Sequence, residues 1–148
     1  SGEALATELD RTQQRLGEAG ERLTAPRRRV LELLLESGQP IKAYDLMAAF
    51  QPGAAPAKPP TVYRALEFLE RQGLIHRIQS LNAYVACARE TEHAAAFLIC
   101  DCCGATAEVD PPASAMMRDA AGHAGFSLTA VTIEAHGLCA DCRDRDAA

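Results

Sequence analysis

The chain has 148 residues, of which 48% are hydrophobic and 24% are charged. This composition is that of an ordinary globular protein and excludes a disordered or fibrous chain. No apolar run approaches the roughly 20 residues that cross a bilayer, and the first residues lack the basic and then apolar pattern of a secretory signal, so we expect a cytoplasmic protein with no membrane partner.

The net charge of −5 is unevenly distributed along the chain. Between Glu21 and Ser80 there are nine basic and six acidic residues, a net of +3, whereas the residues from Leu81 onward sum to −6. Phosphate binding requires Lys and Arg close to the nucleic-acid backbone. The asymmetry therefore indicates that, if the protein binds DNA, the first half makes the contact.

The first half predicts four helices followed by a hairpin. Helix-forming residues, apolar spacing and Gly or Pro breaks place helices at residues 4–19, 25–36, 42–50 and 61–72, a loop at 51–60, and strands at 74–78 and 83–87. Thr24 is expected to cap the second helix, with Pro26 in its first turn and Gly38 after its end. This order is typical of a winged helix-turn-helix module.

The fourth helix of that module should have two different faces. Its apolar side chains fall on one face and its polar ones on the other: Val62, Ala65, Leu66 and Leu69 against Thr61, Tyr63, Arg64 and Glu67. The first face should be buried and the second exposed.

The second half predicts a smaller strand and helix domain. Strands are expected at 94–99, 105–109 and 127–135, a helix at 114–121, and a short charged tail after Cys142. The polar stretch before it reads as a hinge. The chain is thus expected to be α+β, with a winged-helix domain at 1–86, a hinge at 87–93, and a strand and helix domain at 94–148.

Four of the six cysteines form two Cys-x-x-Cys pairs, Cys100 with Cys103 and Cys139 with Cys142. This spacing lets a tight turn place both sulfurs on one tetrahedral metal, and two such pairs complete a four-sulfur structural zinc site. The alternative is a redox dithiol, for which a single pair beside a βαβ unit would be expected. Cys102 fits neither pair, and we expect it to point away as a spare thiol.

Five stretches resemble the ferric uptake regulator family, and within it the zinc uptake regulator branch. They occur in order over residues 22–142: Thr24–Arg28, Ala43–Leu46, Lys58–Leu66, Gln72–His76 and Ile133–Cys139. The segment Pro-Pro-Thr-Val-Tyr-Arg, combined with both cysteine pairs, is difficult to obtain by chance.

The resemblance implies that the helix beginning at Thr61 is a recognition helix in the major groove, with Tyr63 and Arg64 at the bases. The donors of Arg64 suit the O6 and N7 acceptors of guanine, and the Tyr63 ring can pack on a thymine methyl. Arg64 could instead be a solvated charge on the helix surface. The run of three arginines at 27–29 could likewise be a solvated face. Phosphate contacts are expected from Tyr44 and from the cluster Arg27, Arg28 and Arg29.

The resemblance also implies a regulatory zinc site, separate from the four cysteines. Its ligands would be His76, Cys87, His93 and Glu108. Two imidazoles, a thiolate and a carboxylate suit zinc, and the sulfur disfavours manganese or magnesium. Taken singly, His76 and Cys87 could be core residues and the other two surface groups. Two zinc ions per chain are therefore expected, one structural and one regulatory.

Two further histidines have local interpretations. His136 lies three residues before Cys139 and could join a third metal site or support the nearby zinc turn. His123 is expected to cap the C-terminal end of its helix, where a cation favours the helix dipole.

The function implied is that of a repressor rather than an enzyme, with no small-molecule substrate. A zinc-loaded homodimer would bind a palindromic double-stranded DNA operator and repress zinc-uptake genes. The alternatives are a thiol-disulfide enzyme and a zinc-ribbon module that binds only protein. An iron or peroxide sensor of the same family is disfavoured by Cys87, and by a segment 91–95 that carries His93 alone where iron sensors have several histidines.

Overall fold

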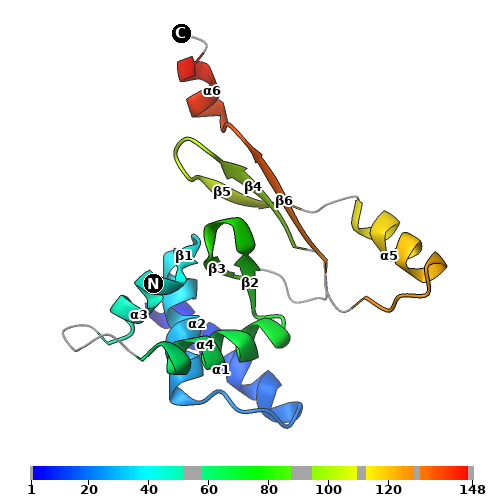
Figure 1. Ribbon diagram of the computed structural model, residues 1–148. Helices are drawn as coiled ribbons and strands as arrows, with labels where there is room; N and C mark the ends of the chain where they lie inside the picture. Colours follow the sequence, from blue (N-terminus) through cyan, green and yellow to red (C-terminus); the bar gives the residue numbers. More distant parts are fainter. Residues whose placement is uncertain (1, 52–57, 88–94, 110–112, 129–130, 147–148) are drawn as a thin grey trace. The chain divides into compact units, whose positions relative to one another are not determined.

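The computed structural model describes residues 2–51, 58–87, 95–109, 113–128 and 131–146. It divides into two compact units, unit 1 (residues 1–88) and unit 2 (89–148), whose elements are labelled in Figure 1. The segment 88–93 of the expected hinge and residues 52–57 of the expected loop lie outside the described residues. No described helix is both long and apolar enough to cross a membrane.

The described residues of unit 1 form four helices and a small sheet. The elements are α1 (Gly2–Glu18), α2 (Ala25–Ser37), β1 (Ile41–Lys42), α3 (Ala43–Ala49), α4 (Pro59–Arg71), β2 (Ile75–Ile78), the 3-10 turn η1 (Gln79–Leu81) and β3 (Ala83–Ala86). The three strands are antiparallel in the order β1-β3-β2. The predicted order of four helices and a hairpin is confirmed. The two-residue strand β1, which pairs with Tyr84 and Ala83, was not expected.

The core of unit 1 forms where α2 packs against α4. Apolar side chains at helical spacing on both helices are at most 2% exposed, among them Val30 and Leu34 on α2 and Val62 and Leu66 on α4. Burying each such side chain contributes about 1.5–3 kcal/mol. This packing fixes the rotation of α4, and therefore determines which of its side chains face outward.

The ends of α2 only partly follow the prediction. Gly38 adopts a left-handed φ of 63° after the last turn, and its N–H donates to the carbonyl of Leu34, as expected of a terminating glycine. Thr24 does occupy the N-cap position, but its side chain makes no capping hydrogen bond. The helix start thus depends on Pro26, whose fixed φ suits the first turn.

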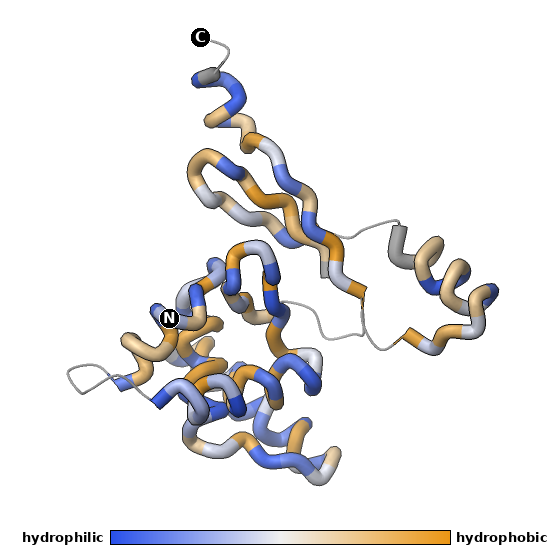
Figure 2. Tube along the Cα trace, in the orientation of Figure 1, coloured by the Kyte–Doolittle hydropathy of each residue, from blue (hydrophilic) through white to orange (hydrophobic). Residues whose placement is uncertain are grey.

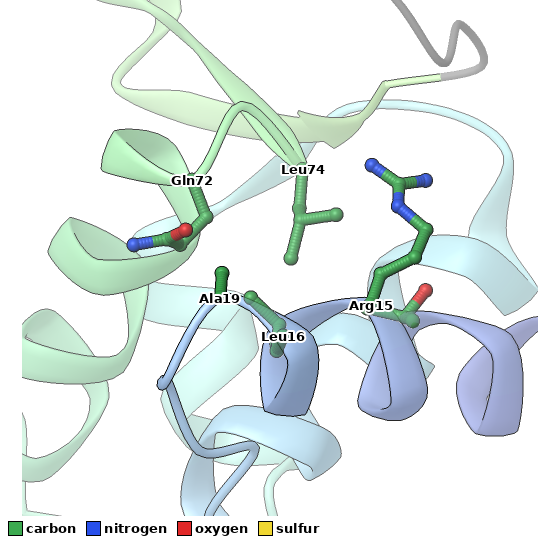
Figure 3. A pocket seen from close by; sticks show the side chains of 6 residues that line it. Arg15, Leu16, Ala19, Gln72 and Leu74 are labelled. Atoms are coloured by element: carbon green, nitrogen blue, oxygen red, sulfur yellow. The ribbon is translucent and has the colours of Figure 1, made fainter.

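A small open hollow of about 140 Å³ lies between α1 and the start of β2 (Figure 3). It is lined by Thr12, Arg15, Leu16, Ala19, Gln72 and Leu74. The lining contains no thiol, imidazole or carboxylate. This hollow therefore does not provide the groups of a thiol or acid–base enzyme.

In unit 2, the part of the chain that the structure describes forms a three-stranded sheet and two helices. The elements are β4 (Ala95–Cys100), β5 (Thr106–Val109), α5 (Ala113–His123), β6 (Thr132–Gly137) and α6 (Ala140–Asp146). β4 is central, antiparallel to β5 and parallel to β6. In Figure 2 this central strand is a nearly continuous hydrophobic stretch, as its run Phe97–Cys100 requires.

One expectation for unit 2 is wrong, and one helix was not expected. The last strand begins at Thr132 rather than at Ser127, and the short charged tail after Cys142 is part of a helix. Helix α6 forms because Cys142 is buried at 3% exposure and because the N–H of Arg143 donates to the carbonyl of Cys139, closing its first turn. The charge pattern of the tail gave no sign of either contact.

Candidate metal centre and nucleic-acid interface

The sulfurs of Cys100, Cys103, Cys139 and Cys142 converge in unit 2. All four lie within 4.8 Å of one another, and the sulfurs of Cys103 and Cys139 are 3.8 Å apart. A tetrahedral zinc with Zn–S bonds of about 2.3 Å needs sulfurs about 3.8 Å apart. The cluster therefore has the composition and the spacing of a four-thiolate zinc site. None of the six cysteines, all of which are among the described residues, forms a disulfide.

The fold of unit 2 explains how two distant pairs meet. Cys100 ends β4 opposite Gly137 at the end of the parallel strand β6, and Figure 1 shows these strands side by side. The N–H of Asp101 donates to the Gly137 carbonyl at 2.8 Å, which ties the two turns together. The first turn is closed by Gly104, whose φ is 79°. As expected, a strand, a helix and a strand fill the interval between the pairs.

The surroundings of the thiols favour a charged sulfur at Cys100. Backbone N–H groups of Cys103 and Cys139 hydrogen-bond to its sulfur and lower the pKa of the Cys100 thiol to about 6. Cys142 behaves oppositely, because hydrogen bonds with the thiols of Cys102 and Cys139 and burial raise its pKa. Thiols this close compete for protons, and a divalent cation would relieve that competition by binding all four as thiolates.

Cys102 differs from the expectation that it points away. It is exposed and is not one of the four converging residues, yet its thiol is a hydrogen-bond partner of Cys142. It thus lies at the edge of the cluster.

His136 connects the two cysteine turns. Its Nδ1 lies 3.0 Å from a carboxylate oxygen of Asp101, and its Nε2 lies 3.7 Å from one of Glu134. The hydrogen bond with Asp101 raises the pKa of His136. This arrangement favours the supporting role over a third metal site. The cap expected at His123 is confirmed, since its Nδ1 lies 2.8 Å from the carbonyl of Asp119 one turn earlier.

The two predicted faces of α4 are confirmed in unit 1. Thr61, Tyr63, Arg64 and Glu67 are exposed, whereas Val62, Ala65, Leu66 and Leu69 are at most 2% exposed. Tyr44 on α3 is 80% exposed. An exposed Tyr–Arg pair at the start of a rigidly packed helix is an arrangement that can enter a DNA groove.

The three consecutive arginines have separate partners rather than forming one solvated cluster. Arg27 lies 3.5 Å above the centre of the Phe68 ring and donates to the Arg22 carbonyl. Arg28 donates to Gln13 at 3.1 Å and lies 3.5 Å from a carboxylate oxygen of Asp10, both on α1.

Arg29 ties α2 to the end of α3. It donates to the carbonyls of Phe50 and Ala49, at 2.7 and 3.2 Å, and to Glu32 at 2.9 Å. These contacts give Arg29 a structural role.

Two of the four expected regulatory ligands meet within unit 1. His76 on β2 pairs with Val85 on β3, and the N–H of Cys87 donates to the Leu74 carbonyl, so that His76 and Cys87 project from the same face of the sheet. A ring nitrogen of His76 and the sulfur of Cys87 lie within 4.8 Å of each other.

The other two expected ligands belong to the rest of the chain. Glu108 lies on β5 in unit 2, opposite Phe97, and is half-buried. His93 lies outside the described residues. Neither the sequence spacing nor the packing of one unit alone connects these two residues with His76 and Cys87.

The chain thus combines a winged helix-turn-helix unit with a four-cysteine metal site, which is the architecture of a metal-dependent DNA-binding regulator. Residues 18–136 match the ferric uptake regulator family. The chain belongs to that family.

The relatives include zinc regulators. The zinc uptake regulation protein of Escherichia coli (strain K12) is 43% identical over 129 residues, which are 85% of this chain and 75% of that protein. A solved zinc uptake regulator complexed with zinc and DNA is 39% identical, with a TM-score of 0.82, covering 97% of this chain and 98% of that one. Holo XcZur is 38% identical, with a TM-score of 0.78 and coverage of 93% and 98%.

Proposed function

We propose that the chain is a zinc-responsive transcriptional repressor that binds a palindromic operator as a zinc-loaded homodimer and represses zinc-uptake genes. The observation that carries this proposal is the similarity, over nearly all of both chains, to a regulator solved with zinc and DNA. Transcription regulators of this family do not form an enzyme class. The protein would act in the cytoplasm, where its DNA target lies. No small-molecule substrate is involved.

The structural zinc would be held by Cys100, Cys103, Cys139 and Cys142. The 3.8 Å separation of two of these sulfurs and the lowered pKa of Cys100 support this assignment. Because the four sulfurs come from both ends of unit 2, a metal bound there would contribute directly to its folding free energy.

The regulatory zinc, the second per chain, would be held by His76, Cys87, His93 and Glu108. The closeness of His76 and Cys87 at the base of the wing supports the first half of this set. The four residues come from the DNA-binding domain (1–86), the hinge (87–93) and the dimerisation domain (94–148). A ligand set distributed in this way makes the mutual placement of these parts depend on zinc. A ligand can shift such an equilibrium only by its difference in affinity for the two states.

Sequence recognition would depend on α4. Arg64 would donate to a guanine edge, and Tyr63 and Thr61 would lie beside it in the major groove, while Tyr44, Arg27 and Arg28 would contact phosphates. The exposure of four of these side chains supports this assignment: Arg64, Tyr63, Thr61 and Tyr44. For Arg27 and Arg28 the internal contacts leave some guanidinium N–H groups available, so that one arginine can both hold the fold and reach a phosphate.

Dimerisation would use unit 2. Large apolar side chains there are exposed in the single chain: Met116 and Met117 on α5, Phe126 after it, Leu98 on β4, and Leu138. Met116 and Phe126 are 73% and 70% exposed. Large apolar side chains exposed on several elements of one unit are available to pack against a second chain. A second copy of the chain would bury these apolar side chains and would also supply the second recognition helix that a palindrome requires.

The other functions considered are less well supported. Reactive thiols would favour a thiol-disulfide enzyme, but four of the thiols converge as a metal site does. A zinc-ribbon module that binds only protein leaves the exposed face of α4 unexplained. The sulfur of Cys87 beside His76 favours zinc over iron or manganese.

The test is a DNA-binding titration of the full chain, followed by fluorescence anisotropy. The probes are promoter fragments of zinc-uptake genes and scrambled fragments of equal length, each measured with added zinc and with a zinc chelator. We expect tight binding only to the promoter fragment with zinc. Equal binding in all four conditions would contradict the proposal.

A further inference from the structure

Helix α6 presents two arginines that differ in what they contact. A guanidinium nitrogen of Arg145, Nη2, donates to the sulfur of Cys142 at 3.4 Å, and its Nε donates to the Asp141 carbonyl at 3.4 Å. Arg143, two residues earlier, reaches only the neighbouring carboxylate of Asp144 at 3.5 Å among its side-chain contacts in the described part of the chain. Helix α6 therefore places one permanent positive charge, that of Arg145, beside the sulfur of Cys142.

The cluster needs such a charge if it holds a divalent metal. Four thiolates and one divalent cation carry a net charge of −2. Cys100 and Cys142 are 4% and 3% exposed, so that water can solvate little of the charge on these two sulfurs, whereas Cys139 is half-buried and Cys103 is exposed. A charged N–H donor to a ligand atom stabilises the ligand in its ionised form and fixes its orientation.

The imidazole of His136 and the backbone N–H groups beside the cluster, both in the described part of the chain, do not serve this purpose. The imidazole of His136 is engaged by the carboxylates of Asp101 and Glu134 rather than by a sulfur. The backbone N–H groups that lower the pKa of Cys100 contribute no net charge. Arg145 thus combines a full charge with a direct contact to one of the four sulfurs.

We infer that Arg145 is an outer-shell residue of the four-cysteine site, whose hydrogen bond to Cys142 slows the release of the metal bound there. This inference rests on the structural zinc proposed above. Helix α6, which the sequence did not predict, would thus close the site and compensate its charge. Arg145 is a positioning residue, since it acts on the metal through a ligand.

The test compares Arg145→Met with Arg143→Met in the zinc-loaded full chain. Both changes remove one exposed arginine from the same helix and leave an unbranched side chain of similar length. The measurement is the rate at which zinc is transferred to a chromogenic chelator in excess. Arg145→Lys is a third variant, which keeps the charge on a different donor geometry.

We expect Arg145→Met to release zinc about tenfold faster than the wild type, the lower end of the roughly 10–100-fold effect of removing an outer-shell partner, because the Arg145 side chain is exposed. Arg143→Met should match the wild type, and Arg145→Lys should lie between. Helix content and oligomer mass are measured in the same samples and should be unchanged in every variant. Unfolding of α6 would instead be expected in both methionine variants, because both arginines lie on that helix.

Three results would overturn the inference, and they are distinguishable. Release from Arg145→Met at the wild-type rate, with zinc bound to the cysteines, would refute the role of Arg145 alone. A wild-type chain that carries no thiol-bound zinc would refute the four-cysteine site itself. Equal acceleration in both methionine variants would show a general effect of charge and would also contradict the specific contact.

Discussion

Arg29 and Arg28 are adjacent on α2, yet the structure predicts very different costs for replacing them with Met. Arg29 donates to the carbonyls of Phe50 and Ala49 at the end of α3, and its side chain is 25% exposed. Arg28 reaches Asp10, whose side chain is 73% exposed. Methionine keeps much of the aliphatic stem in each case, so that the difference reports the polar contacts.

The magnitude follows from these contacts. Hydrogen bonds from a charged donor are worth about 1.5–3 kcal/mol each, but carbonyls at a helix end can recover part of that by bonding to water. The ion pair with Glu32 adds about 0.2–1 kcal/mol. We therefore expect Arg29→Met to lower the free energy of unfolding by about 2 kcal/mol. Arg28→Met should cost at most about 1 kcal/mol, as is typical of an exposed pair.

The assay is urea unfolding of the zinc-loaded full chain, followed by the helical circular dichroism signal. The two variants and the wild type are compared at one protein and zinc concentration, because metal binding and association both shift apparent stability. Equal losses in the two variants, or no loss for Arg29→Met, would refute the structural role assigned to Arg29.

Three further predictions concern the proposed sites. Arg64→Ala should weaken specific DNA binding by about 1–3 kcal/mol per half-site and relax base preference, which anisotropy titrations on cognate and scrambled duplexes measure. Cys100→Ser should lose the structural zinc and with it the dimer, as metal analysis and mass measurement would show; a stable dimer with wild-type zinc content would contradict it. NMR titration should place the pKa of His136 above 6.5, and Asp101→Asn should lower it. Since the folded-state pKa is raised, the contact stabilises the fold fully below about pH 6.5 and less as the pH rises through the raised value; a His136 pKa that is the same with and without Asp101 would refute this cause.

The elements that sequence reasoning predicted correctly are those with local signals. The amphipathic spacing of Val62, Ala65, Leu66 and Leu69 gave both faces of α4, because a helix period of 3.6 residues separates buried from exposed positions. The Cys-x-x-Cys spacing is also a local signal, because a tight turn is enough to bring the two sulfurs of one pair together. The two pairs then meet through the pairing of β4 with β6.

The features that were missed depend on partners far along the chain. β1 exists because Ile41 pairs with Tyr84, and α6 forms around the buried Cys142, whose neighbours lie some 40 positions earlier. The partners of Arg28 and Arg29 likewise belong to other helices. For the regulatory site, the residues themselves give no spacing signal, and only the family resemblance selects His93 and Glu108 to join His76 and Cys87.

The central claim is that zinc bound through Cys87 controls DNA binding, and the variant Cys87→Ala tests it most directly. The matched control is Cys102→Ala, which removes a thiol outside both proposed ligand sets. Operator affinity with and without zinc is measured for each, together with zinc content and dimer mass. We predict that Cys87→Ala stays a folded dimer, binds one zinc fewer per chain and binds operator no better with zinc than without it, while Cys102→Ala behaves as the wild type. Full zinc activation of DNA binding in Cys87→Ala would contradict the account.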